Sequence, residues 1–368
     1  MLFRSEIDAV IECLQDGWLA GFGPRTIEFE KQISTIFGKT FGVFVNSGSS
    51  ACLLALASLQ LPKGSKVLTP ACTFSTTVAP IIQLGLEPIF CDVELQTYVP
   101  SIQQIIDAVT EDTRVIMLPN LIGNKPDWKK LKEYLIQINR DDIVLIEDSA
   151  DTITYTIESD ISTTSFYASH VITAGGSGGM VMFNCEKLRN ICLSFRDWGR
   201  IGDNSEVMSD RFNHLIDNIP YDHKFLYGVL GYNMKSSEMN AAFGLVQLNK
   251  FENFAKIRRN NIQRYISNLK NCKHILLPDD SIQPNWLAIP LQTDHRYELL
   301  NYLEDNDIQT RVTFAGNVTR HPIYRKYLQP FTNADLIMKH GFLLGAHHGM
   351  TIDDVDYVCD KIISFFNK

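Results

Sequence analysis

The chain has 368 residues, of which 45% are hydrophobic and 21% are charged, and its formal net charge is -8. This length and composition predict a soluble globular protein with one large domain and a smaller one. An acidic chain without a concentrated basic stripe lacks the electrostatic footprint of a nucleic-acid-binding protein, and no apolar run approaches the length that spans a membrane.

Residues 1–18 predict an amphipathic helix, because Arg4, Glu6, Asp8 and Glu12 stand among the apolar side chains. The segment therefore lacks the uninterrupted apolar centre of a signal peptide. The eight cysteines are scattered, mostly inside apolar runs, and they show neither a disulfide framework nor a CxxC spacing for a metal. We therefore expect a cytoplasmic protein with buried, reduced thiols and no metal centre.

Apolar segments rich in β-branched residues alternate with helical patterns over the first two thirds of the chain. The strands are expected within 41–48, 65–71, 87–93, 114–120 and 142–150. This alternation predicts βα units and a buried, mostly parallel sheet. Ligands of such sheets bind at the carboxyl ends of the strands, so the loops that follow these segments are where functional residues are expected.

A long helical pattern begins after about residue 233, with apolar residues at helical spacing and a basic outer face. We expect it to connect a large domain, residues 1–245, to a smaller C-terminal α+β domain, residues 246–368. The smaller domain is expected to end in a helix over 352–366. No internal repeat is evident in the sequence, which excludes a solenoid.

Small polar residues follow the first predicted strand, where Asn46, Ser47, Gly48, Ser49 and Ser50 precede a helical pattern. Glycine permits a close backbone approach, and the start of a helix offers free N–H groups and a positive dipole end to a phosphate. The same residues also suit an ordinary helix N-cap. The pattern alone is therefore compatible with a phosphate site or with simple capping.

The fifth predicted strand ends in Glu147 and Asp148, at the edge of the sheet where ligands bind. An Asp there can keep a pyridine nitrogen protonated, which makes a pyridoxal ring an electron sink, or it can cap the following helix. Residues 165–181 add Ser165, His170 and a glycine-rich turn. A lone histidine in an apolar segment is usually structural, but these three segments are each expected at the end of a different strand and converge on one site.

The chain resembles, along nearly its whole length, the sugar aminotransferases of the DegT/DnrJ/StrS family, which are fold-type I pyridoxal phosphate enzymes. The stretches that carry the resemblance, in the family's order and spacing, are GWLAGFGPRTIEFEKQI, NSGSSA, PACTFSTTVAPI, IEDSAD, GYNMKSSEMNAAFGLVQL and FAGNVTRHP. The resemblance implies an α/β fold in which a large domain with a mostly parallel central sheet precedes a smaller C-terminal α+β domain. It also implies pyridoxal 5′-phosphate or pyridoxamine 5′-phosphate as the cofactor.

The resemblance further implies roles for individual residues. Asp148 would pair with the pyridine nitrogen, and Phe74 would stack on the cofactor ring. Asn233 would reach the phosphate from the neighbouring subunit, which implies a homodimer with shared active sites. The residues that match the family's cofactor contacts are Gly48, Ser49, Phe74, Asp148, Asp151, Ser165 and Asn233, and many members carry Gln where this chain has Asp151 near the ring hydroxyl.

Position 170 departs from the family's aminotransferases, which have a lysine there that anchors the cofactor. The family's sugar 3-dehydratases have a histidine, and NSGSSA, TTVAPI, LIGN, RDWGR, YDHK and FAGN also resemble them. In the iron-sulfur kind of these dehydratases, a pair of cysteines follows RDWGR. Gly202 and Asn204 stand at those places here, so the resemblance implies no iron-sulfur cluster and no reductase partner.

The resemblance to the dehydratases also implies a reaction. The cofactor would be held without a covalent bond and used as pyridoxamine phosphate, with L-glutamate as the amino donor. His170 would act as base and then as acid while a nucleotide-linked 4-keto-6-deoxy sugar, a hexose or a heptose, loses its C3 hydroxyl and ammonia is released. GDP is the favoured nucleotide, because the cluster-free dehydratases use it. Dideoxy sugars of this route are made for lipopolysaccharide O-antigens or capsules.

Arg311, Arg320 and His321 are candidate contacts to the substrate. Arginines bind a diphosphate through paired hydrogen bonds, although these two could equally be solvated surface residues. Two other functions stay open at this point. One is a pseudoenzyme that binds the cofactor or a nucleotide sugar. The other is a sugar aminotransferase that anchors the cofactor through a different lysine, for which the candidates are Lys187, Lys224 and Lys235.

Overall fold

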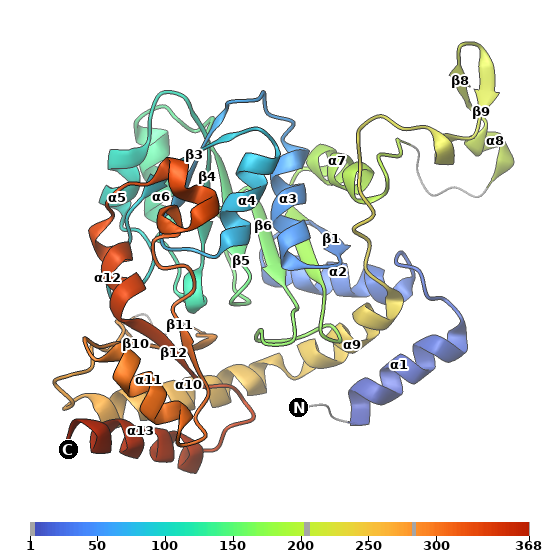
Figure 1. Ribbon diagram of the computed structural model, residues 1–368. Helices are drawn as coiled ribbons and strands as arrows, with labels where there is room; N and C mark the ends of the chain where they lie inside the picture. The colour runs from blue at the N-terminus through green and yellow to red at the C-terminus, as the bar shows by residue number, and fades with distance from the viewer. Residues whose placement is uncertain (1–3, 202–206, 282–284, 368) are drawn as a thin grey trace.

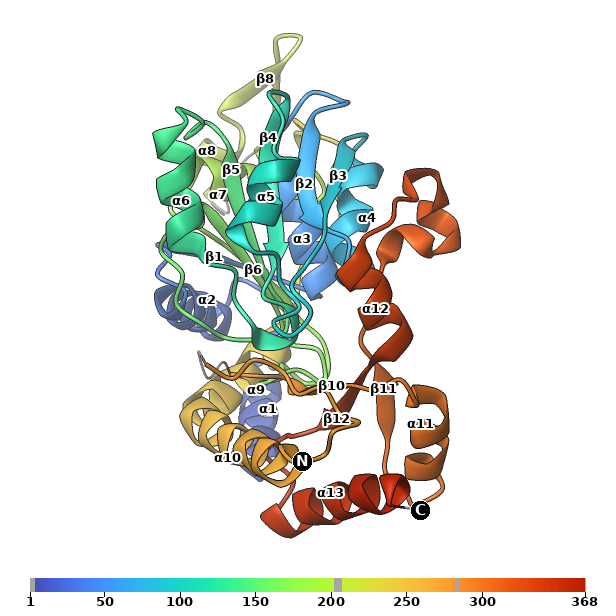
Figure 2. The same ribbon diagram turned by 90° about the vertical axis from the view of Figure 1, so that its left-hand side faces the viewer.

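The computed structural model describes residues 4–201, 207–281 and 285–367. A large domain built on a seven-stranded sheet lies beside a smaller domain built on a three-stranded sheet (Figures 1 and 2). Helices α9 (Glu238–Asn249) and α10 (Phe251–Leu269) run between the two domains and meet at Lys250. The domain boundary that we expect from the sequence, at residue 245, therefore falls inside α9.

The large sheet contains all the strands expected from the sequence. In chain order they are β1 (Phe41–Val45), β2 (Lys66–Pro70), β3 (Glu87–Cys91), β4 (Thr113–Pro119), β5 (Val144–Ser149), β6 (Ile161–Ser165) and β7 (Gly179–Phe183). The strand order is β1-β7-β6-β5-β4-β2-β3. Strand β7 pairs antiparallel with both neighbours, whereas the other pairs are parallel. The prediction of a mostly parallel sheet is confirmed.

Successive residues of the central strands enter different cores, because side chains alternate across a sheet. Val115 and Met117 of β4 pack in the cluster that contains α3 (Gly48–Ser58), and Ile116 and Leu118 pack in the cluster beneath α6 (Trp128–Gln137). The remaining helices of this domain are α1 (Arg4–Asp16), α2 (Pro24–Ile36), α4 (Ser75–Gln83), α5 (Ile102–Ala108), α6 (Trp128–Gln137) and α7 (Glu186–Arg196). A sheet covered on both faces explains why its strands read as almost continuous apolar runs.

A narrow arm projects from the large domain between α7 and α9 (Figure 1). It carries α8 (Met208–Arg211) and a hairpin of β8 (His214–Ile216) and β9 (Ile219–Tyr221). The two turn residues between these strands both have positive φ, 49° and 66°, as a two-residue type I′ hairpin turn requires. Leu215 and Ile219 of the hairpin are exposed.

The small domain has an antiparallel sheet of order β10-β12-β11, formed by β10 (Ala288–Gln292), β11 (Thr310–Val312) and β12 (Gly341–Gly345). Its helices after α10 are α11 (Arg296–Glu304), α12 (Thr332–His340) and α13 (Ile352–Phe366). A separate core that includes Trp286, Leu299 and Ile362 holds these elements together. The short 3-10 helices of the chain are η1 (Leu121–Gly123), η2 (His223–Phe225), η3 (Val318–Arg320) and η4 (Pro322–Tyr327).

All eight cysteines are free, and six of them are buried as predicted, whereas Cys185 is exposed and Cys272 is partly buried. Within the described ranges 4–201, 207–281 and 285–367, no helix combines the length and the apolar character needed to cross a bilayer.

Candidate active site

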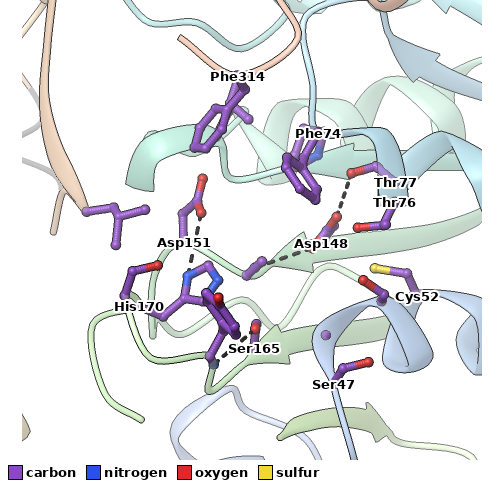
Figure 3. Close-up of a pocket in the computed structure, with 18 residues that line it drawn as sticks. Ser47, Cys52, Phe74, Thr76, Thr77, Asp148, Asp151, Ser165, His170 and Phe314 are labelled. Carbon is purple, nitrogen blue, oxygen red and sulfur yellow. Dashed lines mark hydrogen bonds and ion pairs between the residues drawn. The ribbon is translucent and has the colours of Figure 1, made fainter. Parts of the chain in front are cut away.

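A cavity of about 390 Å³ lies at the carboxyl ends of β4, β5 and β6. The starts of α3 and α4 and the loops after β5 and β6 form most of its wall, and the small domain adds Leu287 and Phe314 (Figure 3). This is the edge of a parallel sheet at which ligands bind. Six of the residues predicted from the sequence line the cavity together with His170, namely Gly48, Ser49, Phe74, Asp148, Asp151 and Ser165.

The start of α3 forms one end of the cavity. The Ser47 side chain caps the helix by accepting a hydrogen bond from the Ser50 N–H at 3.1 Å, and the first N–H groups of a helix have no partner inside it. A Cβ atom at Gly48 would lie 2.6 Å from the Ser165 Cβ, so only glycine allows the backbone to pass this close. The structure therefore shows the helix cap at this position, and the phosphate site predicted from the sequence would use the same start of α3.

Asp148 is the last residue but one of β5 and lines the cavity. The Thr77 hydroxyl donates to its Oδ2 at 2.7 Å, and the side chain is buried. Burial raises the pKa of the Asp148 carboxyl, while the hydrogen bond from Thr77 acts in the opposite direction. A buried carboxylate of this kind is stabilised by a ligand that brings a positive charge or a hydrogen-bond donor to it.

Two aromatic rings stand at the mouth of the cavity. Phe74 immediately precedes α4, and 53% of its surface is exposed. Phe314, from the loop after β11, lies edge-on to it with ring centroids 6.1 Å apart. Contact between apolar rings and water is unfavourable. A flat ligand that stacks on this pair would remove that contact.

His170 and Asp151 face each other across the cavity floor (Figure 3). The His170 Nδ1 lies 3.7 Å from the Asp151 Oδ1. Burial, together with the nearby Arg258 guanidinium, lowers the pKa of His170 to about 4. Burial raises the pKa of Asp151 to about 7. The imidazole is therefore neutral at neutral pH and is available as a base.

None of the three lysines considered as an alternative anchor lines the cavity. Lys187 lies exposed on α7 and Lys224 lies in η2. Lys235 directs its Nζ to Asp197, 3.4 Å from Oδ1, and stacks on the Phe22 ring. Among the residues that the structure describes, the cavity lining includes no lysine at all.

Four other predicted site residues lie outside this cavity. Asn233 is exposed and pairs through its backbone with Asp197. Arg311 is exposed and donates to the Thr310 carbonyl. Arg320 forms an ion pair with Asp335, with Nη2 and Oδ2 2.6 Å apart, and the His321 Nε2 lies 2.9 Å from the Ala315 carbonyl oxygen. Within one chain, the structure therefore gathers the predicted cofactor contacts except Asn233, and it does not gather the predicted substrate contacts.

Thr77, Leu287 and Phe314 line the cavity but were not predicted. The sequence carries a signal for Thr77 alone, since a hydroxyl in the first turn of a helix after a strand is well placed to reach the sheet edge. Gly202 and Asn204 lie outside the described residues. Among the described side chains, no group of three His, Cys, Asp or Glu is arranged to hold a metal ion.

Comparisons with known proteins assign the chain to a family. The model of the DegT/DnrJ/EryC1/StrS aminotransferase family matches residues 2–363. Lipopolysaccharide biosynthesis protein RfbH of Salmonella typhimurium is 36% identical, over 98% of this chain and 89% of that protein. The dTDP-4-dehydro-2,6-dideoxy-D-glucose 3-dehydratase of Saccharopolyspora spinosa is also 36% identical, over 94% of this chain and 81% of that protein.

A solved structure agrees with the fold. The E. coli GDP-4-keto-6-deoxy-D-mannose-3-dehydratase with bound hydrated PLP has a TM-score of 0.87 and 25% sequence identity, over 98% of this chain and 97% of that one. The likeness confirms the fold-type I architecture, and its bound PLP agrees with the cofactor class that the resemblance implied. By sequence and by fold, the chain belongs to the DegT/DnrJ/EryC1/StrS aminotransferase family.

Proposed function

We propose that this chain is a 3-dehydratase that uses pyridoxamine 5′-phosphate to remove the C3 hydroxyl of a nucleotide-linked 4-keto-6-deoxy sugar, with L-glutamate as the amino donor. The observation that carries the proposal is His170 at the cavity floor, with no lysine among the described lining residues. A transaminase needs a lysine amine at the cofactor. An imidazole there can still move protons, so it supports elimination rather than covalent anchoring.

The cavity fits this cofactor at both ends. Gly48 lies so close to Ser165 that a Cβ atom would fill the space, and the α3 N-terminus beside it suits a phosphate. At the other end, Asp148 is buried and accepts a hydrogen bond from Thr77, so a protonated pyridine nitrogen would offset the cost of its charge. Phe74 would cover the ring. When bound, pyridoxamine phosphate supplies an amine for the sugar ketone and a ring that takes up electrons.

The protein's own residues would then manage protons and water. Burial keeps His170 neutral, since its pKa is lowered to about 4, so one ring nitrogen has a free lone pair and can act as a general base at neutral pH. Once protonated, the same ring is a strong acid and donates to the departing C3 hydroxyl. Phe74 and Phe314 narrow the mouth and limit the access of water. Asp148 would keep the pyridine nitrogen of the bound cofactor protonated.

The overall reaction balances without any other reductant. Glutamate is oxidised to 2-oxoglutarate and ammonia. The two electrons that it loses reduce C3 of the sugar, where a C–H bond takes the place of the C–O bond. The oxygen of that hydroxyl is matched by the keto oxygen of 2-oxoglutarate. Each turnover would therefore consume one glutamate and release one ammonia, and the proposal needs no iron-sulfur cluster and no reductase partner.

We also propose that the enzyme is a cytoplasmic homodimer with shared sites. Asn233, the predicted phosphate contact, lies outside its own chain's cavity, as expected of a residue that serves a neighbouring subunit. The arm before it carries exposed apolar side chains, among them Met208 at 70%, Leu215 at 64% and Leu230 at 95% exposure. Apolar surface of this extent on a projecting segment is characteristic of a protein interface. The large domain would comprise residues 1–245 and the small domain residues 246–368.

A product assay tests the proposal. The protein is incubated with pyridoxal phosphate, L-glutamate and a panel of GDP-, CDP- and dTDP-linked 4-keto-6-deoxy sugars, and sugar mass, 2-oxoglutarate and ammonia are followed together. The panel must include both GDP and dTDP sugars, because the names of the relatives point to both nucleotides. We expect one sugar to lose its C3 oxygen, with ammonia and 2-oxoglutarate appearing in equal amounts.

Two other results would overturn the proposal. An amino sugar formed without ammonia would identify an aminotransferase, and borohydride reduction followed by peptide mapping would locate its lysine. The absence of turnover on every sugar, with the cofactor bound, would favour a binding protein without catalysis.

A further inference from the structure

The buried ring nitrogen of His170 faces one carboxyl group. Nδ1 lies 3.7 Å from the Asp151 Oδ1, and within the described part of the chain this buried atom makes no hydrogen bond. The distance exceeds that of a formed hydrogen bond, but contacts of this kind often tighten when the ligand binds. Figure 3 shows Asp151 directed at the imidazole from the loop that follows β5.

Asp151 is itself held by a strained piece of backbone. The Ile122 N–H donates to its Oδ2 at 2.8 Å. Ile122 has φ 61° and ψ 0°, a left-handed conformation that a β-branched side chain rarely adopts. The neighbouring Gly123, also at positive φ, packs so closely that a Cβ atom would lie 2.5 Å from the Asn285 carbonyl oxygen. Strain maintained by its surroundings is typical of functional sites, and its effect here is to fix one oxygen of Asp151 and direct the other to His170.

We propose that Asp151 is a positioning residue for His170: its carboxyl group binds Nδ1 and so determines which nitrogen of the imidazole carries the proton. The inference rests on the proposed function, in which His170 moves the protons. An ionised Asp151 accepts from Nδ1–H and leaves Nε2 as a free base. A protonated Asp151 donates to Nδ1 and places the ring proton on Nε2, where it can be given away.

The charges around the pair suit such an exchange. The pKa of Asp151 is raised to about 7, chiefly by burial; the hydrogen bond from Ile122 opposes the rise and the neighbouring Asp148 adds to it. Burial and the Arg258 guanidinium from α10 lower the pKa of His170 to about 4. The Tyr167 ring lies edge-on to the imidazole, with ring centroids 6.3 Å apart. Near neutral pH the carboxyl therefore changes its protonation while the ring stays uncharged, so the pair alternates between tautomers of a neutral imidazole.

Nitrogen NMR of histidine tests the inference without cofactor or substrate. The protein is labelled with ¹⁵N-histidine, and the His170 signals are assigned by their loss in His170→Asn. We expect the Nδ1–H tautomer at pH 9 and the Nε2–H tautomer at pH 5, with a midpoint near the pKa of about 7 for Asp151. In Asp151→Asn the amide does not titrate, so the change with pH should disappear. Asp112→Asn, the same substitution at an exposed carboxylate paired with Lys66, is the matched control and should retain the change.

The outcomes separate this inference from the proposed function. A His170 tautomer that does not change with pH in the parent protein, or that still changes in Asp151→Asn, overturns the positioning role whatever the enzyme catalyses. The parent measurement decides the question even if a variant fails to fold. In the loaded enzyme, Asp151→Asn should lower kcat about 10-fold or more, with little change in KM, and flatten the pH dependence of kcat near neutrality. An equal loss in Asp112→Asn would overturn the inference, whereas failure of all dehydration with the tautomer change intact would overturn only the proposed function.

Discussion

The predicted site residues fall into two groups: those that line the cavity, and those outside it, which we call the rim. Both groups belong to stretches that resemble the same family, but only the first group is brought together within one chain. Gly48, Asp148 and Ser165 meet at one sheet edge because each stands at or just after the end of a strand. Asn233 and Arg320 lie outside the cavity and contact groups of their own chain, Asp197 and Asp335. Under the proposed function, the fold of one chain builds most of the cofactor contacts, whereas the phosphate contact through Asn233 and the substrate contacts would need a second subunit or the ligand itself.

The largest expected effect comes from the cavity. His170→Asn removes the proposed base but keeps a neutral polar side chain of smaller size, so we expect cofactor binding to persist and C3 elimination to fall by about 10² to 10⁴-fold, the usual contribution of general acid–base catalysis. Product mass measures elimination, and the cofactor's absorbance measures binding. If the variant eliminated the hydroxyl at the parent's rate, His170 would have no catalytic role.

His170→Lys is the complementary change at the same position. It should give a borohydride-reducible bond between this lysine and the cofactor, detected as a pyridoxyl peptide by mass spectrometry, and dehydration should be lost. Dehydration at the parent's rate in this variant would contradict the role proposed for the imidazole.

A smaller effect is expected at the rim, where one experiment tests whether Asn233 serves its own chain or the neighbouring subunit. If Asn233 serves the neighbouring subunit, Asn233→Ala should weaken cofactor binding, and mixing it with His170→Asn should restore activity. Random reassociation places one intact site in each mixed dimer, which gives about a quarter of the parent's sites. Activity is measured after the two variants are dissociated and reassembled together, and each variant treated alone is the control. No recovery in a mixture shown to contain mixed dimers would place Asn233 in its own chain's site.

The sequence predicts the two parts of the molecule unequally, for a physical reason. Strand ends follow from hydrophobic patterning, and parallel topology brings them to one edge, so Gly48, Asp148 and Ser165 could be predicted. Leu287 and Phe314 could not, because they reach the cavity only when the small domain packs against the large one. Phe314 also has a positive φ of 43°, which no local pattern announces. Ile122 could not be predicted either, because the group that contacts Asp151 is its backbone N–H and not its side chain.

The smallest expected effect is on the free energy of unfolding, whose pH dependence should differ between two residues of the cavity, Asp151 and His170. Asp151 has a folded-state pKa of about 7, raised from the ordinary value of 3.8, so its contribution to stability is complete below about pH 4 and is lost as the pH rises to about 7. His170 has a folded-state pKa of about 4, lowered from 6.5. Its contribution is complete above about pH 6.5 and is lost as the pH falls to about 4. The two terms have opposite slopes and similar size, about 3 to 4 kcal/mol each at the limit.

Because the two contributions to stability have opposite pH dependences, removing either residue should leave the pH dependence of the other visible. In Asp151→Asn, the free energy of unfolding relative to the parent should increase between pH 4 and 7, and in His170→Asn it should decrease between pH 4 and 6.5. Urea unfolding of the cofactor-free protein at several pH values measures both differences. Asp112→Asn should show no such slope, because its carboxylate is 70% exposed. Slopes of the same sign in both cavity variants would mean that burial does not displace the two pKa values in opposite directions, and the neutral imidazole on which the proposed chemistry depends would lose its physical basis.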